Sequence, residues 1–600
     1  MPKKGKNQAQ TKAAPAPAVS NKPIPEQQKL PRQLDDLIRA SLKHYQNNHF
    51  DKAIENCKKV LANYPANGEA FSLLAASEYS KDKSKVNPTD ILARLKKGLT
   101  YNLGSPTCWH LYGIILRQEK NYAEACKTYK RLTMMDKSNF GLYRELYYLQ
   151  IHTGDYKGAL ESRAVLASAH PNERTNIVGK AVAADLKGDT KNAIEIIEQF
   201  KKTQKLDETQ INGGLSDIIH YLCSLYKQIG ENQKALDILL EHEYKLFDKV
   251  TTMEKIAELY HIVNNNEKSI ETYKKLLTIN PDNISYYIGI AKALGKEVNN
   301  LGEKTEEFIA ICKEYATKDE DTASVMILRS LPANDEFKTM FKKCLIRLIQ
   351  KHIITVNKLL LSIFKEETSF ESAKKYEIYA TLLNELKSEL TDKEDQEFIV
   401  LTQTIRLIVK NEIAEARKEF DSITIEKETI DNLMVKARLI KKEGDLKQAA
   451  EVMDAARKLD TADRYIANRT AKYYLRYGNV EKGLATFKLF DRPPEKNDSP
   501  TKFEERLDDL EVVWFMTEYA NGFFVAGKLD DAERYAKRVI KAYTTFVDDL
   551  FDFHGYVLDR FSYDTYLSCV RHSKLYGNSQ YKQRATKLLE DIEAKRKEQA

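Results

Sequence analysis

Glycine and proline are scarce in this chain, which has only 23 and 15 of them among 600 residues. This scarcity disfavours many-stranded β architectures, because those depend on tight turns. Long apolar runs are also missing: LLLSIF, which starts at Leu359, is far too short to span a bilayer. We expect no signal peptide and, without an amphipathic arginine pattern near the N-terminus, no transit peptide.

Catalytic and metal-binding motifs are also missing. The seven cysteines include no CxxC pair, which predicts reduced core residues in a cytosolic protein. The sequence contains no GxxxxGK[ST], GxGxxG, HExxH or GxSxG motif, and no Q/R-x-x-G-x-G/A loop that binds acetyl-CoA pyrophosphate. We therefore predict neither a metal site nor catalytic residues, and expect a protein that is not itself an enzyme.

The positive charge is concentrated at the N-terminus. Residues 1–33 hold seven of the Lys and Arg residues, a single acid and six of the prolines, so this segment carries most of the net charge of +7. A segment with so few apolar residues cannot offset its ordering entropy, which predicts a disordered basic arm. Such an arm is suited to RNA, although a solubilising tail is the simpler alternative.

A repeat of 34 residues organises the remainder. In YRELYYLQIHTGDYKGALESRAVLASAHP, the residues Tyr143, Ala159 and Pro171 fall at positions 4, 20 and 32 of a tetratricopeptide (TPR) unit that begins at Phe140. The small residue at position 20 allows the two helices of the unit to approach closely, and the proline ends the second helix. The turn GDYKGA recurs as GDTKNA, GENQKA, GDLKQA, GNVEKG and GKLDDA.

The repeats predict an all-α TPR superhelical solenoid of roughly a dozen helix pairs. The predicted domains are a disordered basic arm (1–33), an N-terminal TPR array (34–300), an irregular helical segment (301–396), a C-terminal TPR array (397–575) with an inserted loop (491–507), and a charged C-terminal helix (576–600).

One cluster of basic residues stands out on the predicted concave surface of the solenoid. In each unit, helix positions 9, 12 and 13 are expected to face this surface. In the units that begin at Ile430 and Arg464, five of these six positions are basic. Arg469, Lys472 and Arg476 also follow one another at i, i+3 and i+7, which places them on one stripe. The cluster predicts a polyanion pocket, with a solvated lysine-rich face as the alternative.

The stretch FVDDLFDFHGYVLDRFSYDTYL, from Phe546, has the composition of an active site. On a helix, however, Asp552 and His554 would point about 200° apart and could not chelate one ion. We therefore interpret this stretch as scaffold, with His554 a hydrogen-bonded structural residue.

Several segments resemble the auxiliary subunit of NatA, a co-translational N-terminal acetyltransferase. The resemblance runs from about residue 34 to 575, and is carried by 95–139, 141–171, 188–204, 433–476 with its KLDTADR motif, the weaker 330–345, and the DFHGY stretch. It implies a non-catalytic TPR scaffold that wraps a small catalytic subunit, which itself binds acetyl-CoA. Family members from animals and fungi continue well past the point where this chain stops.

The resemblance also implies sites and partners. It implies a cytoplasmic, ribosome-associated complex that acetylates Ser, Ala, Thr, Gly, Val or Cys N-termini, with contacts to ribosomal RNA and exit-tunnel proteins, and it allows a further acetyltransferase or regulatory subunit. It implies inositol hexakisphosphate as a structural ligand near 433–476. The expected RNA-binding residues are Lys3, Lys4, Lys6 and Lys12. The expected inositol-phosphate ligands are Lys436, Arg464 and Lys472 from the matching motif, and Arg438, Lys441, Lys442 and Arg476 from the groove argument. The alternative function is a TPR adaptor or co-chaperone that binds acidic peptides.

Overall fold

A computed structural model provides the fold. It describes residues 31–203, 213–298, 301–317, 321–352, 354, 363–364, 370–492, 501–560, 562–572 and 579–599. The predicted disordered arm, including Lys3, Lys4, Lys6 and Lys12, lies outside these residues except at its end.

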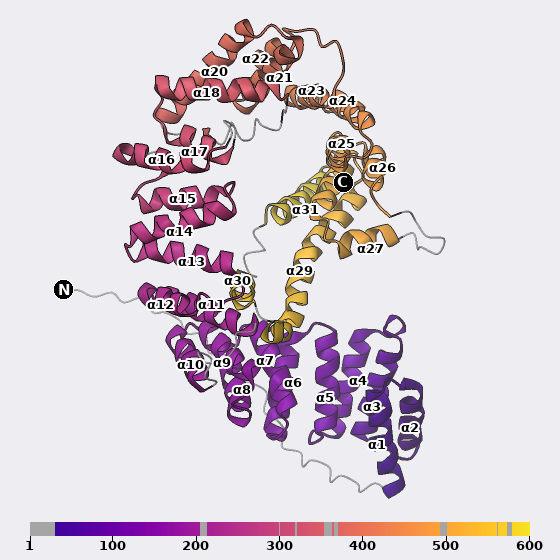
Figure 1. Cartoon of the computed structure of the whole chain (residues 1–600). Coiled ribbons are helices and arrows are strands. Elements are labelled where there is room, and N and C mark those ends of the chain that lie inside the picture. Colours follow the sequence, from indigo (N-terminus) through magenta and orange to yellow (C-terminus); the bar gives the residue numbers. More distant parts are fainter. Residues whose placement is uncertain are drawn as a thin grey trace, which may run out of the picture. The chain divides into compact units, whose positions relative to one another are not determined.

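The described residues form helices and no strands (Figure 1), so the all-α prediction is confirmed. None of these helices is both long and apolar enough to cross a membrane. The α-helices are α1 (Arg32–Gln46), α2 (Phe50–Asn63), α3 (Gly68–Lys81), α4 (Pro88–Tyr101), α5 (Pro106–Gln118), α6 (Tyr122–Met135), α7 (Phe140–Thr153), α8 (Tyr156–Ala169), α9 (Arg174–Leu186), α10 (Thr190–Thr203), α11 (Gly213–Gln228), α12 (Asn232–His242), α13 (Lys249–Ile262), α14 (Asn266–Ile279), α15 (Ile284–Ala293), α16 (Thr305–Tyr315), α17 (Thr322–Ser330), α18 (Asp335–Gln350), α20 (Phe370–Glu389), α21 (Lys393–Val409), α22 (Ile413–Phe420), α23 (Ile430–Glu443), α24 (Leu446–Leu459), α25 (Arg464–Arg476), α26 (Val480–Lys488), α27 (Lys502–Asp509), α28 (Val513–Val525), α29 (Leu529–Arg560), α30 (Tyr563–His572) and α31 (Gln580–Gln599).

The repeat positions behave as the TPR pattern predicts. The position-20 alanines Ala125, Ala159 and Ala193 are completely buried, where each lets the two helices of its unit approach. At Gly113, an added Cβ would lie 2.8 Å from the Tyr129 ring, so a larger residue could not pack there without a shift. The small residues thus set the distance between paired helices.

The recurrent Gly-Asp turn has a simple backbone explanation. Gly154 has a φ of +81°, a left-handed conformation that ends α7, and Asp155 then caps α8 by accepting a hydrogen bond from the Gly158 amide at 3.0 Å. Gly444 and Asp445 repeat this arrangement between α23 and α24. Each turn therefore stops one helix and starts the next.

The compact units and the helix ends show how the chain is divided. Its described residues form two compact units, with the division between residues 149 and 150, inside α7. The predicted boundary at residue 396 falls within α21. Part of the predicted loop 491–507 is helical, because α27 has a short apolar face on which Leu507 is buried and Phe503 is partly buried.

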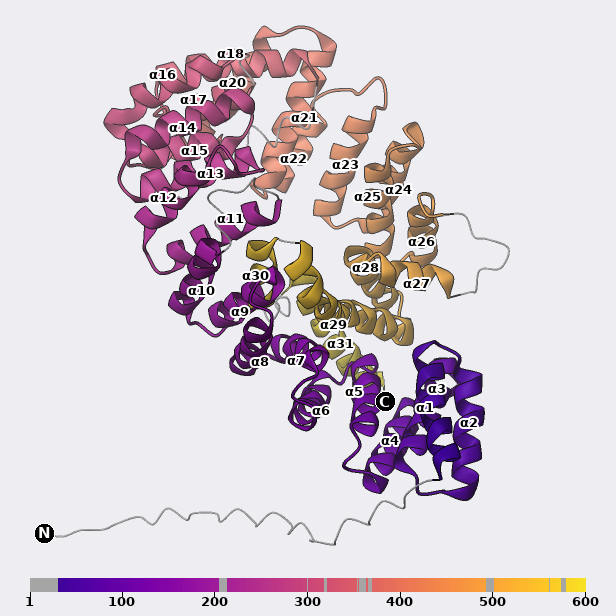
Figure 2. The ribbon, with the colours of Figure 1, turned by 60° about the horizontal axis from the view of Figure 1, so that its bottom comes forward.

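Unit 2 closes on itself through its C-terminal helices. The end of α29 and helix α30 pack against α9 and α11, which precede them by several hundred residues (Figure 2). We call this the return contact, formed by residues 546–572 with residues 152–255. Its apolar part includes Tyr563, which is almost fully buried and lies beside the Tyr221 ring.

Polar side chains fix the return contact. The Asp564 carboxylate accepts a hydrogen bond from Ser224 at 2.8 Å and pairs with Lys255 at 3.0 Å. Arg571 forms an ion pair of 2.7 Å with Asp185, whose side chain is completely buried. The contact therefore depends on specific partners as well as on apolar burial.

His554 lies inside this contact. It is 1% exposed, its Nδ1 lies 2.8 Å from the Tyr566 hydroxyl, and its Nε2 lies 3.1 Å from Nδ1 of His152. Burial and the nearby His152 lower the pKa of His554 to about 3, so the ring is neutral at physiological pH. This agrees with the interpretation of His554 as a structural residue.

Candidate polyanion-binding site

Two helices bring the basic side chains together. Arg438, Lys441 and Lys442 are spaced i, i+3 and i+4 on α23, and therefore lie on one face of that helix. Lys472 and Arg476 are spaced i, i+4 on α25, and α24 packs against both of these helices. We call these five residues, with Arg469 of α25, the basic cluster.

A buried glutamate anchors one side of the cluster. Glu518, on the apolar helix α28, is only 1% exposed. Its carboxylate accepts two hydrogen bonds of 3.1 Å from the Arg476 guanidinium and lies 3.4 Å from the Lys472 ammonium. Burial opposes its ionisation, but the Arg476 hydrogen bonds and the surrounding cations lower its pKa.

A third cation reaches Glu518 from outside the repeat. Arg584 of α31 lies 3.2 Å from the same carboxylate. One negative charge therefore holds three positive charges, which leaves the site strongly cationic.

The remaining cations repel one another. Burial, followed by the charges of Arg476, Arg469 and Arg438, lowers the pKa of Lys441 to about 8. Burial also lowers the pKa of Arg438, and Arg469 adds to that effect. Such mutual repulsion is relieved when an anion binds, so the cluster is suited chemically to a multivalent anion.

The expected ligands do not all join the cluster. Lys436 precedes Arg438 by two residues, which places it about 160° away around α23. Arg464 opens α25, where its guanidinium lies 6.0 Å from the centre of the Phe490 ring. The structure thus brings together the four groove residues and Lys472, with Lys436 on another face of α23 and Arg464 beside Phe490 at the start of α25.

Three residues of the site were missing from the expected ligand set. Arg469 was already visible in the sequence as part of the α25 stripe. Glu518 had a weaker signal, as a lone acid within the apolar run VWFMTEYANGFFV. Arg584 had none, because nothing local to the charged C-terminal helix indicates that it reaches residue 518.

The similarities to known proteins first define the class. Residues 106–139 match the tetratricopeptide repeat model, which agrees with the helical pairs described above. Residues 214–591 match the model described as N-terminal acetyltransferase A, auxiliary subunit. Because that match spans more than half of the chain, the protein belongs to the NatA auxiliary-subunit family, whose members are auxiliary rather than catalytic subunits.

Individual relatives agree with this assignment. The chain is 25% identical to human N-alpha-acetyltransferase 16, NatA auxiliary subunit, over 90% of its length and 62% of the relative's. It is 26% identical to the Arabidopsis thaliana NatA complex auxiliary subunit NAA15, over 90% of its length and 61% of the relative's. The chain thus spans about three fifths of these relatives.

A solved structure extends the likeness to three dimensions. A chain of the structure described as Naa15/Naa10 bound to HypK-THB matches with a TM-score of 0.82 and 26% identity, over 92% of this chain and 82% of that one.

Proposed function

We propose that this protein is the non-catalytic scaffold of a NatA-type acetyltransferase, which binds a small catalytic subunit and shapes its active site. The partner supplies acetyl-CoA binding and chemistry, and acts on nascent chains that begin with Ser, Ala, Thr, Gly, Val or Cys. The observation that carries the proposal is the family match across residues 214–591. The likeness to the Naa15/Naa10 structure supports it.

Co-expression with a small acetyltransferase of the same organism tests the scaffold role. We expect a stable complex that acetylates Ser- and Ala-starting peptides faster than the catalytic subunit alone. A catalytic subunit that neither co-purifies nor changes its rate on those peptides would contradict the proposal.

Ribosome attachment in the cytoplasm is the second part of the proposal. The lysines at 3, 4, 6 and 12 supply positive charge for ribosomal RNA. Deleting residues 1–30 should weaken co-sedimentation with ribosomes in a salt-dependent way, while the catalytic subunit stays bound. Unchanged sedimentation would refute the role of this segment.

The third part assigns inositol hexakisphosphate to the basic cluster. Charge supports it, since the cluster holds six cations and Glu518 pairs with two of them, Lys472 and Arg476. Calorimetric titration should show binding that weakens about tenfold or more in a Lys441→Gln/Arg469→Gln variant, because each lost cation removes a charge-assisted hydrogen bond. Lys58→Gln/Lys447→Gln, an equal charge change on exposed side chains, is the matched control.

Two results would overturn the inositol-phosphate assignment. One is an equal loss of affinity in both double variants. The other is tighter binding of an acidic peptide than of inositol hexakisphosphate, which would favour the TPR-adaptor alternative.

A further inference from the structure

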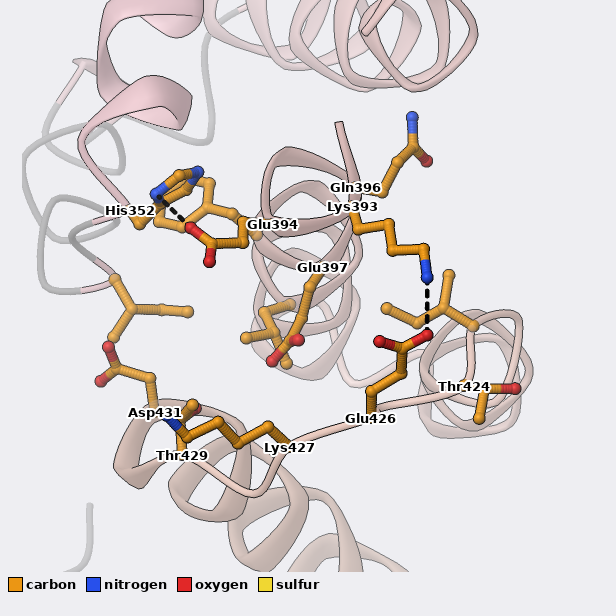
Figure 3. A pocket seen from close by; sticks show the side chains of 14 residues that line it. His352, Lys393, Glu394, Gln396, Glu397, Thr424, Glu426, Lys427, Thr429 and Asp431 are labelled. Atoms are coloured by element: carbon orange, nitrogen blue, oxygen red, sulfur yellow. Dashed lines mark hydrogen bonds and ion pairs between the residues drawn. The ribbon is translucent and has the colours of Figure 1, made fainter. Parts of the chain in front are cut away.

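A cavity of about 520 Å³ opens in unit 2. It lies between the first half of α21, the segment 423–429 and the start of α23 (Figure 3). Its size falls within the range of roughly 300–1,000 Å³ that is typical of ligand sites. No residue of the basic cluster lines it.

The lining of this cavity consists of an apolar wall and a set of mostly acidic charged side chains. Phe398, Leu401 and Ile423 provide an apolar wall, and the first two are buried. The charged side chains that line it are four carboxylates (Glu394, Glu397, Glu426 and Asp431), two ammonium groups (Lys393 and Lys427) and the imidazole of His352. The cavity is therefore both apolar and acidic.

The acids at the rim already have partners. Lys393 pairs with Glu426 at 2.7 Å across exposed side chains. His352 Nε2 lies 2.7 Å from Asp395, and its Nδ1 lies 3.7 Å from Glu394. Because carboxylates face both ring nitrogens, this histidine is not available to the inner acids.

The other two acids, Glu397 and Asp431, differ from the rim acids in their partners, and we call them the inner acids. Glu397 accepts a hydrogen bond of 2.8 Å from the side-chain amide of the buried Asn432. Asp431 precedes Asn432 in the first turn of α23. Among the described residues, no cation lies within ion-pair distance of either carboxylate. Burial raises the pKa of Asp431, which shows that its charge is poorly solvated.

An arginine or lysine side chain complements such a site. Its charged head would pair with the half-buried carboxylates, whose desolvation strengthens the attraction, and its alkyl stem would pack on the apolar wall. In Figure 3 the Glu397 side chain extends from α21 toward the segment that carries Lys427 and Thr429, so the carboxylate faces the cavity.

We propose that this cavity is a docking site for a basic side chain of a partner polypeptide. Charge complementarity selects the occupant, because the inner acids leave the cavity with an unbalanced negative charge beside an apolar wall. No residue of the basic cluster lines this cavity, and the two sites use different residues of α23.

Fluorescence anisotropy with the full chain tests the proposal, using a labelled decapeptide of alternating leucine and arginine. A Glu397→Gln/Asp431→Asn variant should bind this peptide about tenfold more weakly, the loss expected for removing charge-assisted hydrogen bonds in a half-buried site. The matched control, Glu267→Gln/Glu481→Gln, removes two exposed acids elsewhere and should stay within about twofold of the unmodified chain.

A second variant keeps both inner acids, so its result does not depend on whether the Glu397→Gln/Asp431→Asn variant folds correctly. Lys427→Gln removes an exposed cation from the rim, and should tighten binding about twofold because it increases the net negative charge. Equal weakening in both double variants, or weaker binding in Lys427→Gln, would overturn the proposal. So would equally tight binding of a leucine–glutamate decapeptide, or spermidine displacing the peptide at the peptide's own concentration, which would assign the cavity to a free polyamine.

Discussion

The return contact gives the sharpest test of the fold, through substitution of Arg571 by alanine. Arg571 is the ion-pair partner of Asp185, whose side chain is fully buried, and Asp185 also accepts a hydrogen bond from the Tyr221 hydroxyl at 3.3 Å. Arg571 itself is exposed, but its removal leaves the buried Asp185 charge without its ion-pair partner, and removing one partner of a fully buried pair costs about 3–5 kcal/mol. The Tyr221 hydrogen bond and the chance to rehydrate on opening reduce this to about 3 kcal/mol.

The expected result is local opening rather than global unfolding. A change of about 3 kcal/mol corresponds to roughly a hundredfold faster amide exchange in the return contact. Hydrogen exchange followed by mass spectrometry should show this in residues 546–572 and in α9 and α11, while α23–α25 keep the exchange of the unmodified chain. Arg560→Ala, which removes an exposed arginine from the same segment, should leave exchange nearly unchanged.

The double variant Asp185→Asn/Arg571→Ala should recover part of the loss, since it no longer buries an unpaired charge. Exchange in Arg571→Ala that equals the unmodified chain, or that rises equally in α23–α25, would refute the reasoning.

Three further predictions concern pH, charge and packing. The pKa of His554 is about 3 in the fold, well below its value of about 6.5 in an unfolded chain, so the return contact is fully stable above pH 6.5 and loses about 2 kcal/mol by pH 5. Exchange in residues 546–572, corrected for its intrinsic pH dependence, should therefore accelerate over that interval, and His554→Gln should reduce the acceleration. Part of it should remain, because burial also lowers the pKa values of His152 and His220 at the same contact. Glu518→Gln should lower the free energy of unfolding by about 3 kcal/mol, because it leaves three cations without their acid, yet it should tighten inositol hexakisphosphate binding; a weaker affinity would contradict the charge argument. Gly113→Val should lower the thermal midpoint, with a cost of about 1–3 kcal/mol because the new side chain meets Tyr129, whereas an unchanged melting curve would show that the two helices separate freely.

The sequence predicted the features that repeat at fixed spacing. Ala159 and the Gly154–Asp155 turn were predictable because each acts within one helix pair, where periodicity reports the packing. The α23 and α25 stripes were predictable for the same reason. Lys436 was predicted from the motif alone, and the helical period separates it from the others.

Contacts between distant residues could not be predicted in this way. Nothing in the sequence around Arg584 indicates that it meets Glu518, and nothing around Arg571 indicates Asp185. Helix α27 was missed because the prolines that precede it indicate a loop. Its apolar face consists of only Phe503 and Leu507, which is too short to indicate a helix. The boundary between the two compact units also lies within helix α7, where the local pattern gives no break.

The return contact also determines the order of events during synthesis. His554 and His152 are 402 residues apart, so α7 to α13 leave the ribosome long before their partners in α29 and α30 exist. At about 5–20 residues per second, that separation lasts roughly 20–80 s. During this interval the helix pairs can fold locally while the Asp185 carboxylate remains hydrated and unit 2 remains open. A protein that is to lie within unit 2 therefore has a kinetic window, before the last helices dock, in which it can enter without breaking a single native contact.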